Sequence, residues 1–219
     1  MQSPGELNGP TVPSAAGGHP TSIVVLLHGY GSNGQDLIGL VPYWRDALPH
    51  TLFVAPNAPD VCPGAPGGYQ WWSLTSRSDS DRALGVRQPV AAVNRFIDHA
   101  LERYRLQADK LALVGFSQGT MLALHVGPRR YPSLAGILGY SGMLVDGESL
   151  AAELRTTPPV LLVHGDSDAM VPVSSSREAA ATLQPLGFMV RTHVSPGIGH
   201  SIDEAGIELG GQFLVDILG

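Results

Sequence analysis

The sequence alternates unbroken apolar runs of strand length with stretches whose apolar residues recur at helical spacing. Strands are predicted over Ser22–Leu27, Thr51–Ala55, Lys110–Gly115, Leu134–Tyr140, Val160–Val163 and Met189–Val194. Helices are predicted over Gly85–Tyr104, Thr120–Val126, Arg177–Leu186 and Asp203–Leu218. Continuous apolar strands suit a sheet that is buried on both faces. The pattern therefore predicts an α/β fold, with a mostly parallel central sheet, helices on both faces and right-handed crossovers.

The length and composition favour one packed domain. With 219 residues, 43% of them hydrophobic and 15% charged, the chain is long enough to bury a large core. Residues 1–20 are rich in Pro, Gly and Ser, so we expect a flexible N-terminal segment followed by a single domain over residues 21–219. Residues 60–81 show no period and many turn formers, which predicts long surface loops.

Charge and cysteine content exclude several classes of protein. The formal net charge is −6 and the 13 Lys and Arg residues form no run, which argues against a nucleic-acid partner. Cys62 is the only cysteine, so no intramolecular disulfide is possible. No apolar stretch approaches transmembrane length and the N-terminus lacks a secretory signal. We therefore expect a cytoplasmic protein without stable membrane insertion.

A candidate nucleophile lies between a predicted strand and a predicted helix. The segment Gly115–Gly119 matches the G-x-S-x-G pattern of a nucleophile elbow, with Ser117 at its centre. The pattern alone is weak in a chain with 27 glycines, but its strand-turn-helix setting is the one that the motif requires. Glycines are needed there because a serine on a sharp turn leaves no room for neighbouring side chains.

A serine hydroxyl requires a base within hydrogen-bonding reach and a third group that holds the base. His200 is the candidate base, because it lies in a glycine-containing loop after the last predicted strand. Asp168 is the candidate acid, because it comes late in the loop after another buried strand, whereas Asp166 is placed to close the turn. The chain order Ser117, Asp168, His200 is that of α/β-hydrolases.

Two backbone N–H groups are candidates for an oxyanion hole, in which each donor contributes about 3 kcal/mol of transition-state stabilisation. The elbow supplies the N–H of Gln118, and the glycine-containing loop His28–Gly31 follows an early strand and supplies the N–H of Tyr30.

These residues predict a serine hydrolase that forms an acyl-enzyme. A peptidase or lactonase would use the same residues with a different pocket, and a non-catalytic binding protein could keep the same fold. Ser141 also follows a strand, but Met143 replaces the second glycine of an elbow, so a structural role is expected for that serine.

Five segments, in order, resemble motifs of the phospholipase/carboxylesterase branch of α/β-hydrolases, which includes acyl-protein thioesterases and small bacterial carboxylesterases. They are Leu27–Gly31, Pro56–Pro59, Gly115–Gly119, His164–Asp168 with Val171–Pro172, and Gly199–His200. The resemblance places the acid on Asp168 and the oxyanion donors on Tyr30 and Gln118. It implies an α/β-hydrolase fold without a separate lid domain, which needs no metal or cofactor and cleaves carboxylic esters of short to medium acyl chains. Some relatives cleave thioesters, lysophospholipids or S-acylated proteins.

The chain departs from this family pattern in two places. Tyr30 stands where the thioesterases usually have a smaller apolar residue, and the loop Gly68–Leu74 carries two tryptophans near where relatives shape the acyl pocket. The resemblance implies substrate contacts for Trp72, Leu74 and Val171, and core packing beneath the loop is the alternative for Trp71 and Trp72. The expected partner is a small acyl ester or thioester, bound by a monomer or a homodimer.

Overall fold

The computed structural model describes residues 7–74 and 78–219, which build a central seven-stranded sheet. In the order of the sheet, its strands are β1 (Thr11–Val12), β3 (Thr51–Val54), β2 (Ser22–Leu27), β6 (Leu111–Phe116), β7 (Gly136–Tyr140), β8 (Val160–Gly165) and β9 (Val190–Ser195). All neighbouring pairs are parallel except β1 and β3. The prediction of a mostly parallel sheet is therefore confirmed.

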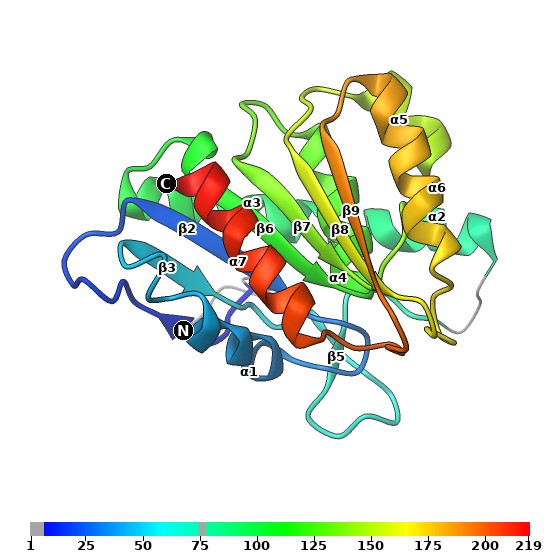
Figure 1. Cartoon of the computed structure of the whole chain (residues 1–219), viewed down its shortest axis with the longest axis horizontal. Coiled ribbons are helices and arrows are strands. Elements are labelled where there is room, and N and C mark those ends of the chain that lie inside the picture. The colour runs from blue at the N-terminus through cyan, green and yellow to red at the C-terminus, as the bar shows by residue number, and fades with distance from the viewer. Residues whose placement is uncertain (1–6, 75–77) are drawn as a thin grey trace.

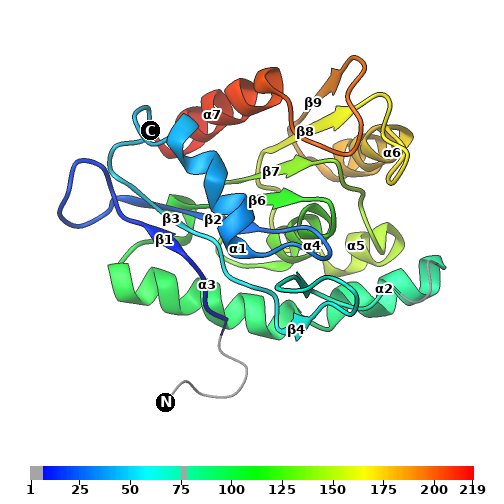
Figure 2. The same cartoon turned by 90° about the horizontal axis from the view of Figure 1, so that it is seen from below.

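Helices cover both faces of this sheet, as Figure 2 shows. Helices α1 (Gly34–Leu37) and α7 (Glu204–Leu218) lie on one face, and α2 (Asp79–Arg87) and α3 (Val90–Tyr104) lie on the other. The remaining α-helices are α4 (Gln118–Val126), α5 (Gly147–Glu153) and α6 (Ser174–Leu183). Short 3₁₀ helices span Ile38–Tyr43, Ala108–Lys110, Gly127–Arg129 and Gln184–Leu186. In Figure 1, α7 crosses in front of the central strands.

Alternate residues of the central strands supply two hydrophobic cores. In β2, Ile23, Val25 and Leu27 face the α3 and α4 side, whereas Val24 and Leu26 face the α7 side. All five side chains are fully buried. Burial of one such side chain contributes roughly 1.5–3 kcal/mol, so both faces hold the sheet rigid beneath the loops at its edge.

The helix predicted over residues 85–104 is two helices. Helix α2 ends at Arg87 and α3 begins at Val90, with Pro89 at the N-cap position of α3. A proline lacks the N–H that a continuous helix would need, so the chain turns there. Helix α2 also begins earlier than expected, because the Ser78 side chain accepts a hydrogen bond from the N–H of Asp81 and caps its first turn.

The segment predicted as long loops over residues 60–81 also contains a small hairpin. Strands β4 (Asp60–Val61) and β5 (Tyr69–Gln70) pair antiparallel outside the main sheet. Strands of two residues are too short to show a period, so the hairpin could not be predicted from the apolar pattern. Residues 75–77 of the predicted loop lie outside the described residues.

The predicted boundary at residue 20 does not separate the preceding residues from the packed domain. Leu7 is buried, and β1 adds to the edge of the sheet by pairing with β3. The flexibility expected for residues 1–20 stays a prediction, and residues 1–6 lie outside the described residues.

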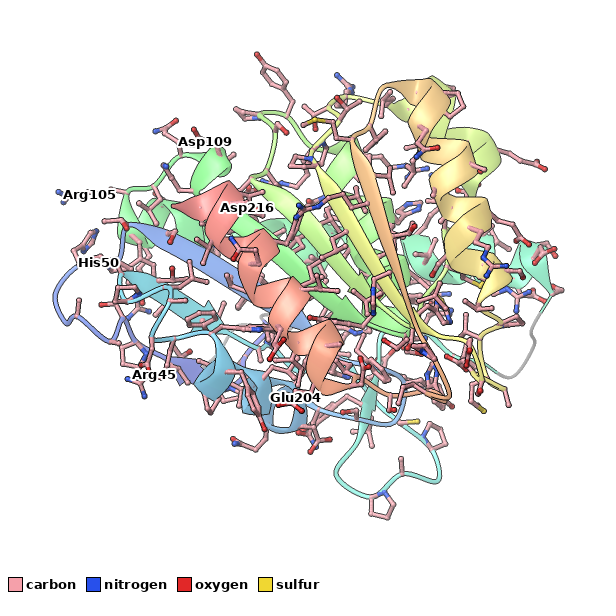
Figure 3. The ribbon with its side chains drawn as sticks, viewed as in Figure 1. Arg45, His50, Arg105, Asp109, Glu204 and Asp216 are labelled. Atoms are coloured by element: carbon pink, nitrogen blue, oxygen red, sulfur yellow. The ribbon has the colours of Figure 1, made fainter. Side chains whose placement is uncertain are left out.

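Many charged side chains lie at the periphery, whereas His28, His125, His164 and Asp168 are buried. Figure 3 labels six of the peripheral side chains, all exposed: Arg45, His50, Arg105, Asp109, Glu204 and Asp216. Within residues 7–74 and 78–219, the helices are too short or too polar for any of them to cross a bilayer.

Candidate active site

Ser117 lies at the turn between β6 and α4, in a backbone conformation that side chains rarely adopt. Its φ is 53° and its N–H donates to the carbonyl of Tyr140 at 2.9 Å. A Cβ on Gly115 would lie 2.4 Å from the backbone N of Thr120, and one on Gly119 would lie 1.8 Å from the carbonyl oxygen of Leu27. Only glycine fits at both positions, so the sequence of the elbow is fixed by main-chain packing.

His200 reaches Ser117 from the loop between β9 and α7. Its Nε2 lies 3.0 Å from Ser117 Oγ, and its ring lies 5.0 Å from that of Phe116, centroid to centroid. Asp166 anchors this loop, because its Oδ1 accepts a hydrogen bond of 2.7 Å from Gly197 N. The turn-closing role expected for Asp166 stays a prediction, because this bond joins Asp166 to a different loop. The hydrogen bond to Asp166 thus helps to hold in place the loop that carries the His200 imidazole.

Asp168 holds the other side of the same imidazole. Its Oδ2 lies 2.7 Å from His200 Nδ1, and its Oδ1 accepts hydrogen bonds from the N–H groups of Met170 at 2.8 Å and Val171 at 2.9 Å. Burial favours a raised pKa for Asp168, but the hydrogen bonds from His200, Val171 and Met170 outweigh it and lower the pKa. The carboxylate is therefore ionised at neutral pH, which fixes the proton of His200 on Nδ1 and leaves Nε2 free to accept from Ser117.

The two predicted oxyanion donors are free to bind a ligand. Within the described part of the chain, neither Tyr30 N nor Gln118 N has a hydrogen-bond acceptor. The neighbouring Gly31 N donates to Tyr69 O at 2.9 Å, which ties the Tyr30 loop to β5. Gln118 N is at the first residue of α4, where the helix dipole favours negative charge.

The Tyr30 side chain is 39% exposed at this loop. A hydrogen bond with Cys62 raises the pKa of the Tyr30 phenol. The phenol is therefore neutral at pH 7.

The His28 side chain forms hydrogen bonds that hold the Tyr30 loop, a role that could not be read from the sequence. Its Nδ1 lies 2.7 Å from the carbonyl oxygen of Gly29, and its Nε2 accepts from Ala58 N at 3.0 Å. Burial lowers the pKa of His28, in keeping with a neutral ring that donates through Nδ1. The ring thus joins two of the predicted motifs, since Ala58 belongs to Pro56–Pro59. The presence of both motifs, Leu27–Gly31 and Pro56–Pro59, was the only feature of the sequence that could have pointed to this role of His28.

The Gln118 side chain has a second role that the sequence analysis also missed. Its Oε1 accepts from Trp71 N at 2.9 Å, and its Nε2 donates to Trp72 O at 2.9 Å. Both bonds are buried, with Gln118 only 1% exposed. The residue after the nucleophile therefore fastens the tryptophan loop to the elbow.

The three residues expected to contact substrate lie in different settings. Trp72 is 1% exposed and packs closely against Gly85 of α2, so core packing accounts for its position without a substrate. Leu74 is half-buried against the same core. Val171 is buried and uses its N–H to hold Asp168. Substrate contact by these three side chains stays a prediction.

The arrangement defines a class of protein. A serine on a strand-to-helix elbow, a histidine and a buried aspartate form one hydrogen-bonded row at the carboxyl ends of β6, β8 and β9, which is the architecture of an α/β-hydrolase. Among the described residues, no group of three His, Cys, Asp or Glu side chains gathers as a metal site would.

The chain belongs to the phospholipase/carboxylesterase family, because the model of that family matches residues 9–216. It is thus an enzyme of the carboxylic-ester hydrolase class.

Individual relatives agree with this assignment. The chain is 28% identical to acyl-protein thioesterase 1 of Gibberella zeae over 209 residues, covering 88% of each chain. It is 24% identical to esterase YpfH of Escherichia coli, covering 90% of this chain and 81% of that one. The crystal structure of esterase PE8 superposes with a TM-score of 0.93 at 44% identity, covering 97% of this chain and 100% of the other.

Proposed function

We propose that this protein hydrolyses carboxylic esters of short to medium acyl chains, with Ser117 as nucleophile, His200 as base and Asp168 as the acid that orients the base. The observation that carries the proposal is the unbroken row of contacts, 3.0 Å from Ser117 Oγ to His200 Nε2 and 2.7 Å from His200 Nδ1 to Asp168 Oδ2. A tight, correctly ordered row of this kind is what activates a serine hydroxyl at neutral pH.

In the first half of the reaction, Ser117 Oγ attacks the acyl carbon while His200 Nε2 takes its proton. The imidazolium formed is stabilised by the ionised Asp168. His200 then returns the proton to the alcohol oxygen as the ester bond breaks, which leaves an acyl-enzyme on Ser117. In the second half, His200 removes a proton from water, the resulting hydroxide attacks the acyl carbon, and the acid leaves as Ser117 recovers its proton.

The unpaired N–H groups of Tyr30 and Gln118 support an oxyanion hole in this scheme. Neither donor has an internal acceptor in the described residues; Gln118 follows Ser117 and begins a helix, and Gly29, the residue before Tyr30, lies against Ser117. Preorganised donors of this kind cost no reorganisation when the carbonyl oxygen becomes negative.

Thioester or lysophospholipid hydrolysis is the second candidate. The curated relatives named acyl-protein thioesterase 1 favour it, whereas the more similar esterase PE8 favours oxygen esters. The chemistry at Ser117 is the same for both, so the bound acyl chain and leaving group decide between them. We further propose that the enzyme acts in the cytoplasm on a small-molecule substrate, as a monomer or homodimer.

The test is a comparison of initial rates on matched oxygen esters and thioesters from acetyl to palmitoyl. Ser117→Ala is expected to lower kcat by about 10⁶-fold with the fold intact, because the row loses its nucleophile. Ser133→Ala is the matched control, since Ser133 lies before β7 and bonds only its neighbour's carbonyl, that of Leu134.

A short-chain oxygen-ester preference that disappears in Ser117→Ala supports the proposal, and a long-chain thioester preference supports the second candidate. Labelling by a fluorophosphonate probe should occur in the wild type and in Ser133→Ala but not in Ser117→Ala. Full turnover by Ser117→Ala would overturn the assignment of the nucleophile.

A further inference from the structure

A second histidine lies beneath the catalytic row, buried against the carboxylate. His164 is in β8, four residues before Asp168, and its Nε2 lies 3.3 Å from Asp168 Oδ2, the oxygen that also contacts His200. Both side chains, His164 and Asp168, are 0% exposed. The mechanism above makes no use of His164.

Both nitrogens of His164 have defined partners. Nε2 lies 2.8 Å from the carbonyl oxygen of Val171, and Nδ1 lies 2.5 Å from the hydroxyl of Ser176 on α6. Because the two neighbours of Nε2 are a carbonyl oxygen and a carboxylate oxygen, Nε2 must carry a proton and donate it. Its N–H therefore points at the loop that holds the acid.

The backbone N–H and the carbonyl oxygen of Val171 both form hydrogen bonds with side chains. Asp168 Oδ1 accepts from the N–H of Val171 at 2.9 Å, and His164 Nε2–H donates to its carbonyl oxygen at 2.8 Å. The turn from Asp168 to Val171 is thus closed on one side by the carboxylate and fastened to β8 and α6 on the other by His164. These hydrogen bonds fix the orientation of the Asp168 carboxylate.

We propose that His164 is a positioning residue for the reaction: its Nε2–H fixes the Asp168 turn and faces the carboxylate, so that Asp168 Oδ2 meets His200 Nδ1 in the geometry that catalysis needs. This inference rests on the function proposed above. It adds a hydrogen-bonded extension, Ser176 to His164, to the Ser117, His200 and Asp168 row.

A buried histidine that only fills space would differ from His164, and the chain contains one. His125 in α4 is 1% exposed, and its Nδ1 has no hydrogen-bond partner in the described residues. His164, in contrast, uses both nitrogens, and one of them is directed at the catalytic acid. His125→Asn is therefore a control for the general cost of changing a buried histidine.

A pair of amides tests the proposal, because they differ by one methylene. In His164→Asn the amide reaches the position of Nδ1 and Ser176, but no donor reaches Val171 O. In His164→Gln the amide N–H₂ reaches the position of Nε2 and restores that donor. We expect kcat to fall about tenfold or more in His164→Asn with KM little changed, since the hydrogen bond to Val171 O and the contact with the Asp168 carboxylate are both lost, and to recover largely in His164→Gln.

A spectroscopic readout separates positioning from folding. The proton shared by His200 Nδ1 and Asp168 gives a strongly downfield resonance, which should broaden or shift in His164→Asn and return in His164→Gln. His125→Asn should leave both kcat and this resonance unchanged. If His164→Asn does not fold, Ser176→Ala releases Nδ1 and should shift the same two readouts in the same direction by less.

The proposal is overturned if His164→Asn, or Ser176→Ala in its place, keeps wild-type kcat and an unchanged His200 resonance. It is equally overturned if Asn and Gln at residue 164 lower kcat alike. Loss of the proposed function looks different: in that case Ser117→Ala retains turnover, or the wild type has none, while the resonance still reports on the His164 contact.

Discussion

The two ends of α4 both carry clusters of polar groups, but the hydrogen bonding of the two clusters differs. At the N-terminal end, Ser117 has a positive φ and the N–H groups of Gln118 and Tyr30 have no internal acceptor in the described residues. At the C-terminal end, Arg129 donates to Glu153 Oε2 at 2.6 Å, and Arg87 donates to Asp146 Oδ2 at 2.6 Å. The N-terminal end therefore has donors available for a ligand, whereas the charged groups at the C-terminal end already bond to one another.

The C-terminal cluster resembles a site until its partners are counted. A cavity of about 660 Å³ opens beside it, and His125 lines that cavity. Burial, with the nearby charges of Arg129 and Arg87, lowers the pKa of His125 to about 4. The guanidinium groups are already bonded to Glu153, Asp146 and the Ser149 hydroxyl. The proposed active site is therefore identified by unpaired donors and a strained serine, and not by the size of a cavity or the density of charge.

Among substitutions that keep the shape of the side chain, Asp168→Asn is expected to lower activity most, because it removes the charge of the proposed acid. In Asp168→Asn the amide can donate to His200 Nδ1, which favours the wrong tautomer and leaves Nε2 protonated. We expect kcat/KM to fall about 10⁴-fold with little change in the temperature of unfolding, measured with the ester substrates used for Ser117→Ala. A loss of less than tenfold would show that Asp168 does not orient the base.

Gln118→Met should have an intermediate effect, because it keeps the backbone N–H and the side-chain volume. It removes the hydrogen bonds to Trp71 N and Trp72 O and leaves a buried N–H unpaired, which costs about 1–3 kcal/mol of unfolding free energy. We expect kcat to fall about tenfold as the tryptophan loop loosens beside the elbow. Denaturant unfolding and kinetics measure the two effects, and unchanged stability would mean that the two bonds are not formed.

Glu153→Gln should have the smallest effect, and on stability alone. Hydrogen bonds from Arg129 and then Arg87 lower the pKa of Glu153 to about 2. Because the folded-state pKa is depressed, its contribution is present above the ordinary pKa of 4.5 and is lost as the pH falls from there towards 2. The side chain is 36% exposed, so solvent screening limits the contribution to about 1 kcal/mol or less.

The measurement for Glu153→Gln is the free energy of unfolding as a function of pH, with kcat at neutral pH beside it. The variant should be less stable than the wild type at pH 7, the difference should shrink in acid, and kcat should not change. A fall in kcat with full folding would show that the two ends of α4 are coupled.

The main strands and their parallel order could be predicted because each is a continuous apolar run, as Ser22–Leu27 illustrates. The placement of Ser117 could be predicted because the G-x-S-x-G pattern stands between a strand and a helix that are both readable from the sequence, although the contact that requires Gly119 is with the distant Leu27. The contact of His200 with Asp168 followed from their places at the ends of neighbouring strands.

What the sequence could not supply depends on contacts between distant segments. The break at Pro89 interrupts a pattern that keeps its apolar spacing on both sides, so periodicity alone did not reveal it. The hydrogen bonds of Gln118 to the tryptophan loop join residues 47 and 46 positions apart. No local pattern reports such a pairing.

The proposed nucleophile follows an inner strand of the sheet, and the proposed base follows an edge strand. Ser117 follows β6, which has neighbours on both sides, whereas His200 follows β9, which ends the sheet and has only β8 beside it. An outermost strand opens locally at a smaller free-energy cost than an inner one. We therefore expect the heat resistance of the activity to depend on how firmly β9 stays docked, and mutations that strengthen the contact of β9 with β8 to extend the working temperature.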